Sequence, residues 1–206
     1  MSFRSGRSWA TRKMIERGGE SGQTSMTQDQ VPADHFWVFG YGSLMWKPGF
    51  DYLERQRATM HGVHRSPCIF SWVHRGTVAS PGIVMGLDEG GFCEGVAFKV
   101  NMNQQREVVD YLRARELVTN VYIEVTREGH LDNGETVPML CYVADTTHQQ
   151  YADNLSIDAL VAQISGAEGQ SGKNEDYILD TVEKMREMEI HDERMEAVAA
   201  RLSRPG

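Results

Sequence analysis

Excess positive charge and long apolar runs are both missing from this chain of 206 residues. Acidic residues outnumber lysine and arginine by 29 to 21, so the formal net charge is −8 and no basic face is expected to attract nucleic acid. No apolar run approaches the roughly 18 residues of a membrane-spanning helix. The N-terminus also lacks the apolar segment of a secretory signal. We therefore expect a cytoplasmic protein without nucleic-acid or membrane partners.

The motifs that would indicate a metal, a cofactor or a disulfide are missing as well. Cys68, Cys93 and Cys141 form no CxxC pair and lie in apolar segments, so we expect buried, reduced thiols. The histidines show no HxxxH or HExxH spacing, which argues against a metal site. GxGxxG, GK[ST] and GxSxG are absent too. We expect neither a metal nor a cofactor.

Composition divides the chain near residue 33. The N-terminal part is polar and rich in arginine and serine, whereas the sequence becomes apolar and aromatic from Asp34 onward. Polar segments of this kind bury too little apolar surface to fold alone. We expect residues 1–33 to be a flexible extension and residues 34–206 to form one domain.

Strand patterns dominate the first two thirds of that domain. Short apolar runs, rich in β-branched and aromatic residues, alternate with turn residues. The DEGG sequence at 88–91 predicts a turn between two strands, and the LDNGE sequence at 131–135 predicts another. The predicted strand segments cover residues 35–42, 58–74 (interrupted near Pro67), 83–100, 121–129 and 136–145.

Helical periodicity occurs once between the strands and again at the end of the chain. Residues 101–118 carry apolar side chains at helical spacing, and Asn103 is a candidate N-cap. Residues 156–165 and a longer amphipathic segment, 175–203, follow after a glycine-rich break. Strands followed by helices indicate the α+β class.

The stretch FGYGSL at residues 39–44 is the first candidate site. Gly40 and Gly42 permit positive φ angles and close approach of a ligand to the backbone. Successive N–H groups in such a turn can bind a carboxylate or phosphate. An ordinary strand-to-loop turn explains the same residues, and the sequence leaves both interpretations open.

Two charged residues are further candidates. Glu116 ends the predicted helix and is either a solvated surface residue or, if it faces a cleft, a proton-transfer group whose pKa is raised by burial. Arg75 lies in the predicted loop 74–82 and is a candidate anion ligand, although most surface arginines bind none. Sequence alone does not decide either case.

Five motifs occur together in a recognisable order. These are WVFGYGSLMWKPGF, HRGT followed by PG, EGVAFKV, YLRARE and SGKNEDYI. In this order they resemble the ChaC-like γ-glutamylcyclotransferases that act on glutathione, over roughly residues 36–190. The resemblance implies a small mixed β-barrel flanked by helices. It also implies a lyase that forms 5-oxoproline and Cys-Gly from a small-molecule substrate.

The resemblance also implies roles for individual residues. Glu116 matches the catalytic glutamate, Glu107 falls where some members carry a second important acid, and Tyr142 matches a strand tyrosine near the cavity. The substrate-binding loop corresponds to Tyr41, Gly42, Ser43 and Leu44.

The chain departs from the family pattern at positions outside the loop and Glu116. Ile83 follows Pro81-Gly82 where members often carry arginine, and Glu94 precedes GVA where many carry tryptophan. Other γ-glutamyl amines or amino acids therefore stay open as substrates. A γ-glutamyl binding module without catalysis is a further alternative, although a pure binder has less need of a base at Glu116. Oligomeric state does not follow from the sequence.

Overall fold

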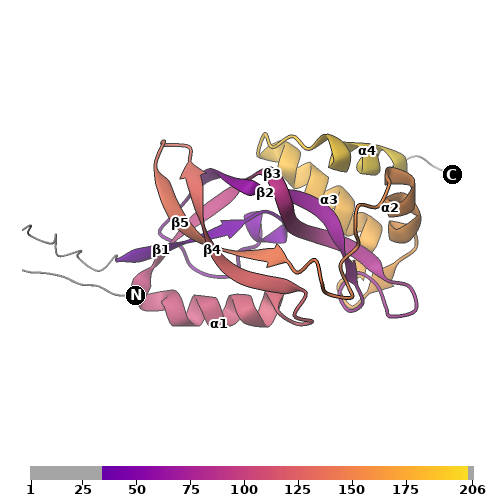
Figure 1. Ribbon diagram of the computed structural model, residues 1–206, viewed down its shortest axis with the longest axis horizontal. Helices are drawn as coiled ribbons and strands as arrows, with labels where there is room; N and C mark the ends of the chain where they lie inside the picture. The colour runs from indigo at the N-terminus through magenta and orange to yellow at the C-terminus, as the bar shows by residue number, and fades with distance from the viewer. Residues whose placement is uncertain (1–33, 204–206) are drawn as a thin grey trace, which may run out of the picture. The chain divides into compact units, whose positions relative to one another are not determined.

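The computed structural model describes residues 34–203, in which five strands close into a barrel in the order β1-β3-β2-β4-β5 (Figure 1). β1 and β5 run parallel, and the other neighbouring strands are antiparallel. The barrel is therefore mixed, as the resemblance implied. The strands are β1 (His35–Gly40), β2 (Glu54–Ser71), β3 (Gly82–Asn101), β4 (Tyr122–Leu131) and β5 (Thr136–Ala144), with a separate short pair, β6 (Glu168–Gly169) and β7 (Gly172–Lys173).

Helices flank the barrel, which confirms that part of the expected fold. In Figure 1, α1 lies along one side, whereas α2, α3 and α4 gather on another. The helices are α1 (Gln105–Glu116), α2 (Ile157–Ile164), α3 (Asn174–Glu187) and α4 (Glu193–Leu202), with 3-10 turns η1 (Ser43–Met45) and η2 (Met102–Gln104). Among the described residues, no helix has the length and apolar character needed to cross a membrane.

The apolar run of β1 is explained by burial on both of its faces. Trp37 and Phe39 belong to a core cluster that includes side chains of α2, α3 and α4. Val38 belongs to a second cluster with Val108 and Leu112 of α1. Because successive strand side chains point to opposite faces, a strand between two cores must be apolar throughout.

The predicted turn at residues 88–91 is wrong, because β3 continues through it as one strand paired with β2. Gly90 and Gly91 have φ angles of 89° and 69°, and Gly62 on the facing strand has a φ of 78°. The pairing register shifts between His61 and Val63 at this point. The glycines therefore form a bulge, which bends a strand without ending it.

Two details of the predicted helices are also corrected. Asn103 does not cap α1; the side chain of Asn101 instead accepts a hydrogen bond from the N–H of Asn103 at the start of η2. The amphipathic segment after residue 174 is two helices rather than one. Glu189 has a φ of 58°, and Asp192 begins α4 by accepting a hydrogen bond from the N–H of Met195. The predicted strand at residue 35 and the hairpin around residues 131–135 are confirmed.

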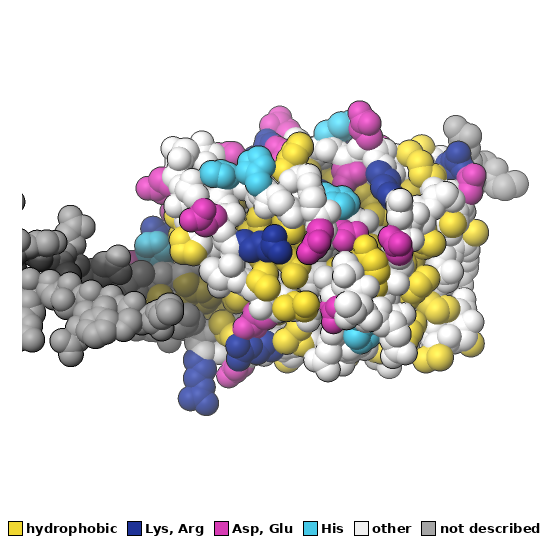
Figure 2. All heavy atoms as spheres, in the orientation of Figure 1, with side chains coloured by type: hydrophobic (Ala, Val, Ile, Leu, Met, Phe, Trp, Pro, Cys, Tyr) yellow, Lys and Arg dark blue, Asp and Glu magenta, His cyan; other side chains and the backbone are white. Residues whose placement is uncertain are grey.

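Charged side chains of both signs lie close together on the molecular surface. Figure 2 shows acidic groups beside lysine and arginine on the displayed face. No group of three or more histidine, cysteine, aspartate or glutamate side chains within residues 34–203 is arranged to hold a metal ion. The proposed extension, residues 1–33, lies outside the described residues.

Candidate active site

The loop after β1 turns back tightly at Gly40. A Cβ atom at this position would lie 3.0 Å from Cβ of Leu44 and 3.3 Å from the backbone N of Met45. Gly40 and Gly42 do not adopt positive φ, so that part of the sequence-based expectation is wrong. The first glycine serves close packing instead, because only a residue without a side chain leaves room for η1 against the end of β1.

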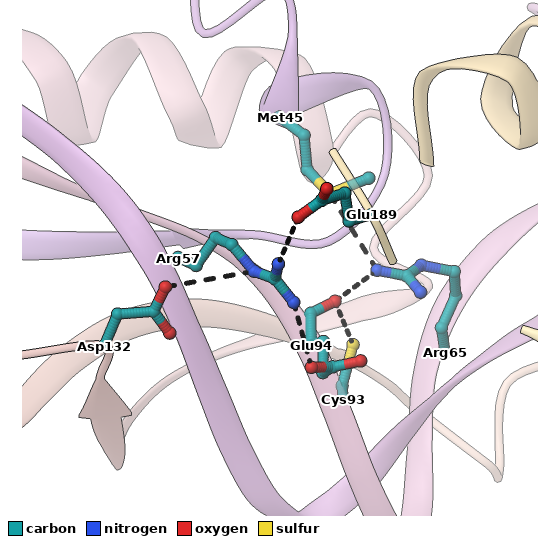
Figure 3. A network of polar contacts seen from close by, with 7 residues as sticks. All are labelled: Met45, Arg57, Arg65, Cys93, Glu94, Asp132 and Glu189. Carbon is teal, nitrogen blue, oxygen red and sulfur yellow. Dashed lines mark hydrogen bonds and ion pairs between the residues drawn. The ribbon is translucent and has the colours of Figure 1, made fainter. Parts of the chain in front are cut away.

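A buried arginine on β2 holds the loop through a hydrogen bond to its backbone. Nε of Arg65 donates to the carbonyl oxygen of Tyr41 at 2.6 Å, and Nη2 donates to the carbonyl oxygen of Glu94 at 2.6 Å. Figure 3 shows Arg65 directed toward Glu94 and the sulfur of Met45. Leu44 is buried in the core. The loop is thereby anchored on both sides of Gly42.

At the first turn of η1, the loop presents backbone N–H groups. The N–H of Met45 donates to the carbonyl oxygen of Gly42, which is the first bond of this 3-10 turn. The N–H groups that begin a helical turn have no partner within it. The N–H groups of Ser43 and Leu44 occupy these positions and can donate hydrogen bonds to an anionic or carbonyl oxygen of a ligand.

Glu116 is the last residue of α1 and lies largely out of solvent. Its side chain is 18% exposed, and Oε1 lies 3.1 Å from Nε of Arg115. Burial raises the pKa of the Glu116 carboxyl, and the Arg115 guanidinium acts in the opposite direction. A carboxyl with a raised pKa exchanges protons more readily near neutral pH than an exposed one.

Arg115 connects this carboxyl to the loop. Nη2 donates to Oγ of Ser43 at 2.7 Å, and Nη1 donates to the carbonyl oxygen of Lys47 at 2.7 Å and to the hydroxyl of Tyr111 at 3.1 Å. The guanidinium therefore holds Glu116, the start of η1 at Ser43 and the backbone beyond η1 at Lys47 in one arrangement. Sequence analysis missed this residue, and its position directly before Glu116 was the available signal.

Three tyrosines, one buried and two half-buried, line the cavity together with Glu116. Burial raises the pKa values of Tyr41, Tyr122 and Tyr177, and the charge of Glu116 shifts them in the same direction. The hydroxyl of Tyr122 donates to the carbonyl oxygen of Met85 at 2.7 Å, and the hydroxyl of Tyr177 accepts from the N–H of Met85 at 3.3 Å. The cavity wall thus consists of neutral phenols at physiological pH. Tyr177 lies in the SGKNEDYI motif, whereas Tyr122 carried no distinguishing sequence signal.

These groups line one cavity of about 580 Å³. This volume lies in the range of pockets that bind small molecules, roughly 300–1,000 Å³. Apolar and aromatic side chains form much of the wall, and polar groups come from Glu116, η1 and the loops that carry His74, Arg75 and Ser171. The cavity suits a small, flexible, polar ligand.

Two further loops, one carrying His74 and Arg75 and the other carrying Ser171, contribute to the cavity wall. Nδ1 of His74 lies 3.1 Å from Oγ of Ser171, and Nη1 of Arg75 donates to the carbonyl oxygen of Lys173 at 3.2 Å. The Arg75 guanidinium also lies over the ring of Tyr177, 5.1 Å from its centroid. The HRG and SGKN motifs, about one hundred residues apart, therefore meet at the cavity.

The structure brings together all but one of the residues assigned by resemblance. Glu107 lies on the exposed first turn of α1 and does not line the cavity. The hydroxyl of Tyr142 points to Glu124, donating to Oε2 at 2.9 Å. The assigned residues that do line the cavity are Tyr41, Gly42, Ser43, Leu44, Glu116 and Tyr142.

The cysteines lie elsewhere in the fold. Cys68, Cys93 and Cys141 are free and buried, and none lines this cavity. Burial raises the pKa of the Cys68 and Cys141 thiols to about 12. They are therefore protonated at neutral pH, and the thiolate that a nucleophilic mechanism needs is not available.

Comparison with known proteins gives consistent matches. A family model described as "ChaC-like protein" matches residues 36–204. The glutathione-specific gamma-glutamylcyclotransferase of Escherichia coli K12 is 31% identical over 157 residues, covering 76% of this chain and 68% of the relative. The glutathione-specific gamma-glutamylcyclotransferase 1 of Danio rerio is 36% identical over 156 residues, covering 73% and 79%.

A solved structure shares the fold. The crystal structure of a selenomethionine-labelled γ-glutamylcyclotransferase specific to glutathione, from yeast, superimposes with a TM-score of 0.74 at 23% identity. The match covers 82% of this chain and 96% of the yeast chain. At this identity the likeness concerns the fold alone.

Proposed function

The chain belongs to the ChaC-like family, and on this premise we propose that it is a γ-glutamylcyclotransferase that cleaves glutathione to 5-oxoproline and Cys-Gly. The observation that carries the proposal is the placement of Glu116. It is a largely buried carboxyl that lines a ligand-sized cavity together with Ser43 and Leu44 of η1. This is the arrangement that an internal acyl transfer requires.

The reaction is an attack within the substrate. The α-amino nitrogen of the γ-glutamyl group forms a bond to the side-chain carbonyl carbon, and the bond from that carbon to the cysteine nitrogen breaks. The products are the five-membered lactam and the free amine of Cys-Gly. Because nucleophile and electrophile belong to one molecule, holding the chain in the attacking shape can contribute on the order of 7–11 kcal/mol.

Glu116 is the proposed catalytic residue. In its ionised form it takes a proton from the substrate ammonium, which frees the nitrogen lone pair for attack. The protonated carboxyl then returns the proton to the departing cysteine nitrogen. One carboxyl thus acts as base and as acid, and such proton transfers typically contribute roughly 10²–10⁴-fold in rate.

The loop is the proposed substrate-binding element. Because Gly42 has no side chain, the γ-glutamyl end of the substrate can approach the backbone. The N–H groups of Ser43 and Leu44 can then donate hydrogen bonds to the carbonyl oxygen, on which negative charge develops. Tyr41 and Tyr142 supply walls that exclude water. Glu107 stays a prediction that rests on the resemblance, since it lies outside the cavity.

The first test measures 5-oxoproline and Cys-Gly released from reduced glutathione by wild type and Glu116→Gln. The substitution keeps the size of the side chain and removes the base, so we expect a loss of at least about 100-fold in kcat. Glutathione binding to the variant, measured by calorimetry, should persist. Glu183→Gln is the matched control, because Glu183 is exposed on α3 and lies outside the cavity.

Three results would contradict the proposal. Turnover by Glu116→Gln within about tenfold of wild type would remove Glu116 from its role. If wild type releases 5-oxoproline only from γ-glutamyl amines or γ-glutamyl amino acids, these compounds and not glutathione are the substrates. Stoichiometric binding without any release would indicate a binding module.

We also propose that the reaction takes place in the cytoplasm. All three cysteines are free in the structure, which suits a reducing compartment. Fractionation of cells that produce the protein would test this location, and recovery in an oxidising compartment would contradict it.

A further inference from the structure

The cavity lining contains a second arginine that makes no contact with the Glu116–Arg115 pair. This residue, Arg75, belongs to the loop between β2 and β3 and lines the cavity together with His74 and Ser171. The mechanism proposed above uses none of these three residues. Their presence in the lining of a substrate cavity therefore needs an explanation.

The two arginines of the cavity differ in how fully they are bonded. The Arg115 guanidinium contacts the Glu116 carboxylate, two hydroxyls and a backbone carbonyl. The Arg75 guanidinium donates one hydrogen bond, to the carbonyl oxygen of Lys173. No carboxylate among residues 34–203 lies within 4.0 Å of it, although Glu116 and Asp180 line the same cavity. Most of its five N–H groups are therefore available to donate hydrogen bonds to a ligand.

The Arg75 guanidinium is held in place before any ligand arrives. It lies over the ring of Tyr177, at 5.1 Å from the ring centroid, and the bond to Lys173 fixes it from the side. Tyr177 is fixed in turn, because its hydroxyl accepts from the N–H of Met85. A guanidinium held over an aromatic ring keeps N–H donors available for a carboxylate, which arginine can bind with two parallel hydrogen bonds.

Tyr177 lies near both Arg75 and the loop that precedes η1. Its hydroxyl is 3.9 Å from the position of a Cβ on Gly42, whereas its ring faces Arg75. Gly42 and Arg75 are therefore both neighbours of the same tyrosine side chain. Two extended peptide residues span at most roughly 7 Å, a length suited to a dipeptide that extends from the loop past this tyrosine.

We propose that Arg75 binds the terminal carboxylate of the peptide that follows the γ-glutamyl group, which in glutathione is the glycine carboxylate. The inference rests on the proposed function. The α-carboxylate of the γ-glutamyl group is two bonds from the attacking nitrogen and stays near Glu116 and η1. The second carboxylate lies at the opposite end of the substrate molecule, and Arg75 is the arginine of the cavity lining that is bonded to neither Glu116 nor η1. Arg75 would thus select γ-glutamyl peptides that end in a carboxylate over γ-glutamyl amines that lack one.

The test compares glutathione with its glycyl monoethyl ester, which lacks only the terminal charge. Wild type should prefer glutathione in kcat/KM by roughly 10- to 100-fold, the range of one charge-assisted contact. Arg75→Met should lose most of this preference by lowering kcat/KM for glutathione and leaving the value for the ester within about threefold of wild type. Arg75→Lys keeps the charge without the bidentate geometry and should retain part of the preference.

Lys47→Met is the charge-matched control. Lys47 lines the same cavity from the loop side, with an exposed side chain, and its removal should leave the ratio between the two substrates unchanged. A ratio that changes with Lys47→Met and not with Arg75→Met would assign the carboxylate to Lys47 and overturn the proposal. Equal losses on both substrates in Arg75→Met would also overturn it, because Arg75 would then act only by holding Tyr177 and the loops.

Binding separates this inference from the proposed function. Glutathione and its ester are titrated by calorimetry into Glu116→Gln and into the double variant with Arg75→Met. A preference for glutathione that disappears in the double variant supports the carboxylate contact whether or not wild type forms 5-oxoproline. Equal affinity for the two ligands in Glu116→Gln contradicts the contact even if wild type is an active cyclotransferase.

Discussion

Glu116 is subject to two opposing influences. Burial raises the pKa of its carboxyl, whereas the guanidinium of Arg115 stabilises the ionised form. A base that must be ionised loses activity as pH falls through its pKa. Since the net shift is upward, activity should fall on the acid side at a higher pH than an ordinary glutamate would give.

Substitution of Arg115 tests this balance. Arg115→Met removes the group that opposes burial, so the pKa of Glu116 rises further and the acid limb of the pH profile of kcat/KM moves to higher pH. KM should also increase, because Oγ of Ser43 and the carbonyl oxygen of Lys47 lose their shared donor.

Two further variants complete that experiment. Arg115→Lys retains the charge and should restore the position of the acid limb without fully restoring KM. Arg106→Met removes a charge from the exposed surface of the same helix, where the side chain is 96% exposed, and should leave the profile unchanged. An acid limb that stays at the wild-type pH in Arg115→Met would show that Arg115 does not act on the base.

At the scale of elements, Asn174 joins α3 to the barrel. Its side chain is fully buried; Oδ1 accepts from the N–H of Ile83 and Nδ2 donates to the carbonyl oxygen of Ile83, both at 2.7 Å. The amide thus pairs with β3 as a neighbouring strand would. Because Tyr177 lies one turn further along α3, the same contact positions the ring beneath Arg75.

Asn174→Ala should therefore destabilise the fold. It leaves two buried backbone groups without partners, at about 1–3 kcal/mol each in the free energy of unfolding. Asn103→Ala is the control, since Asn103 is exposed and its side chain caps nothing; we expect a change within about 0.5 kcal/mol. Urea unfolding measures both, and equal stability of the two variants would contradict the role of Asn174.

At the scale of the whole molecule, the barrel, the flanking helices and the cavity all lie within residues 34–203. Both large core clusters are built from this segment as well. A polypeptide of residues 34–206 should therefore fold and retain the kcat/KM of the full chain within about twofold, well under the tenfold that 1.4 kcal/mol produces. Thermal unfolding and 5-oxoproline release measure this, and a truncated chain that is folded but inactive would assign a function to residues 1–33.

The sequence by itself determined most of the strands and helices of the domain, because their signals are local. The apolar run of β1, the periodicity of α1 and the turn residues between β4 and β5 can each be identified within a dozen residues. The loop at residues 41–44 and Glu116 were identified from motifs in fixed order. Spacing along the chain carried that information without any knowledge of three-dimensional contacts.

Only the tertiary structure decided how these parts act together. Gly90 and Gly91 form a bulge instead of a turn because β2 runs opposite them with Gly62. Glu116 faces the cavity and Glu107 does not, although both lie on one helix, since the end of α1 meets η1 and its start is exposed. Arg115 and Arg75 acquire distinct roles from partners about 70 and 98 residues away. Such contacts depend on how the chain closes the barrel, and no local pattern encodes them.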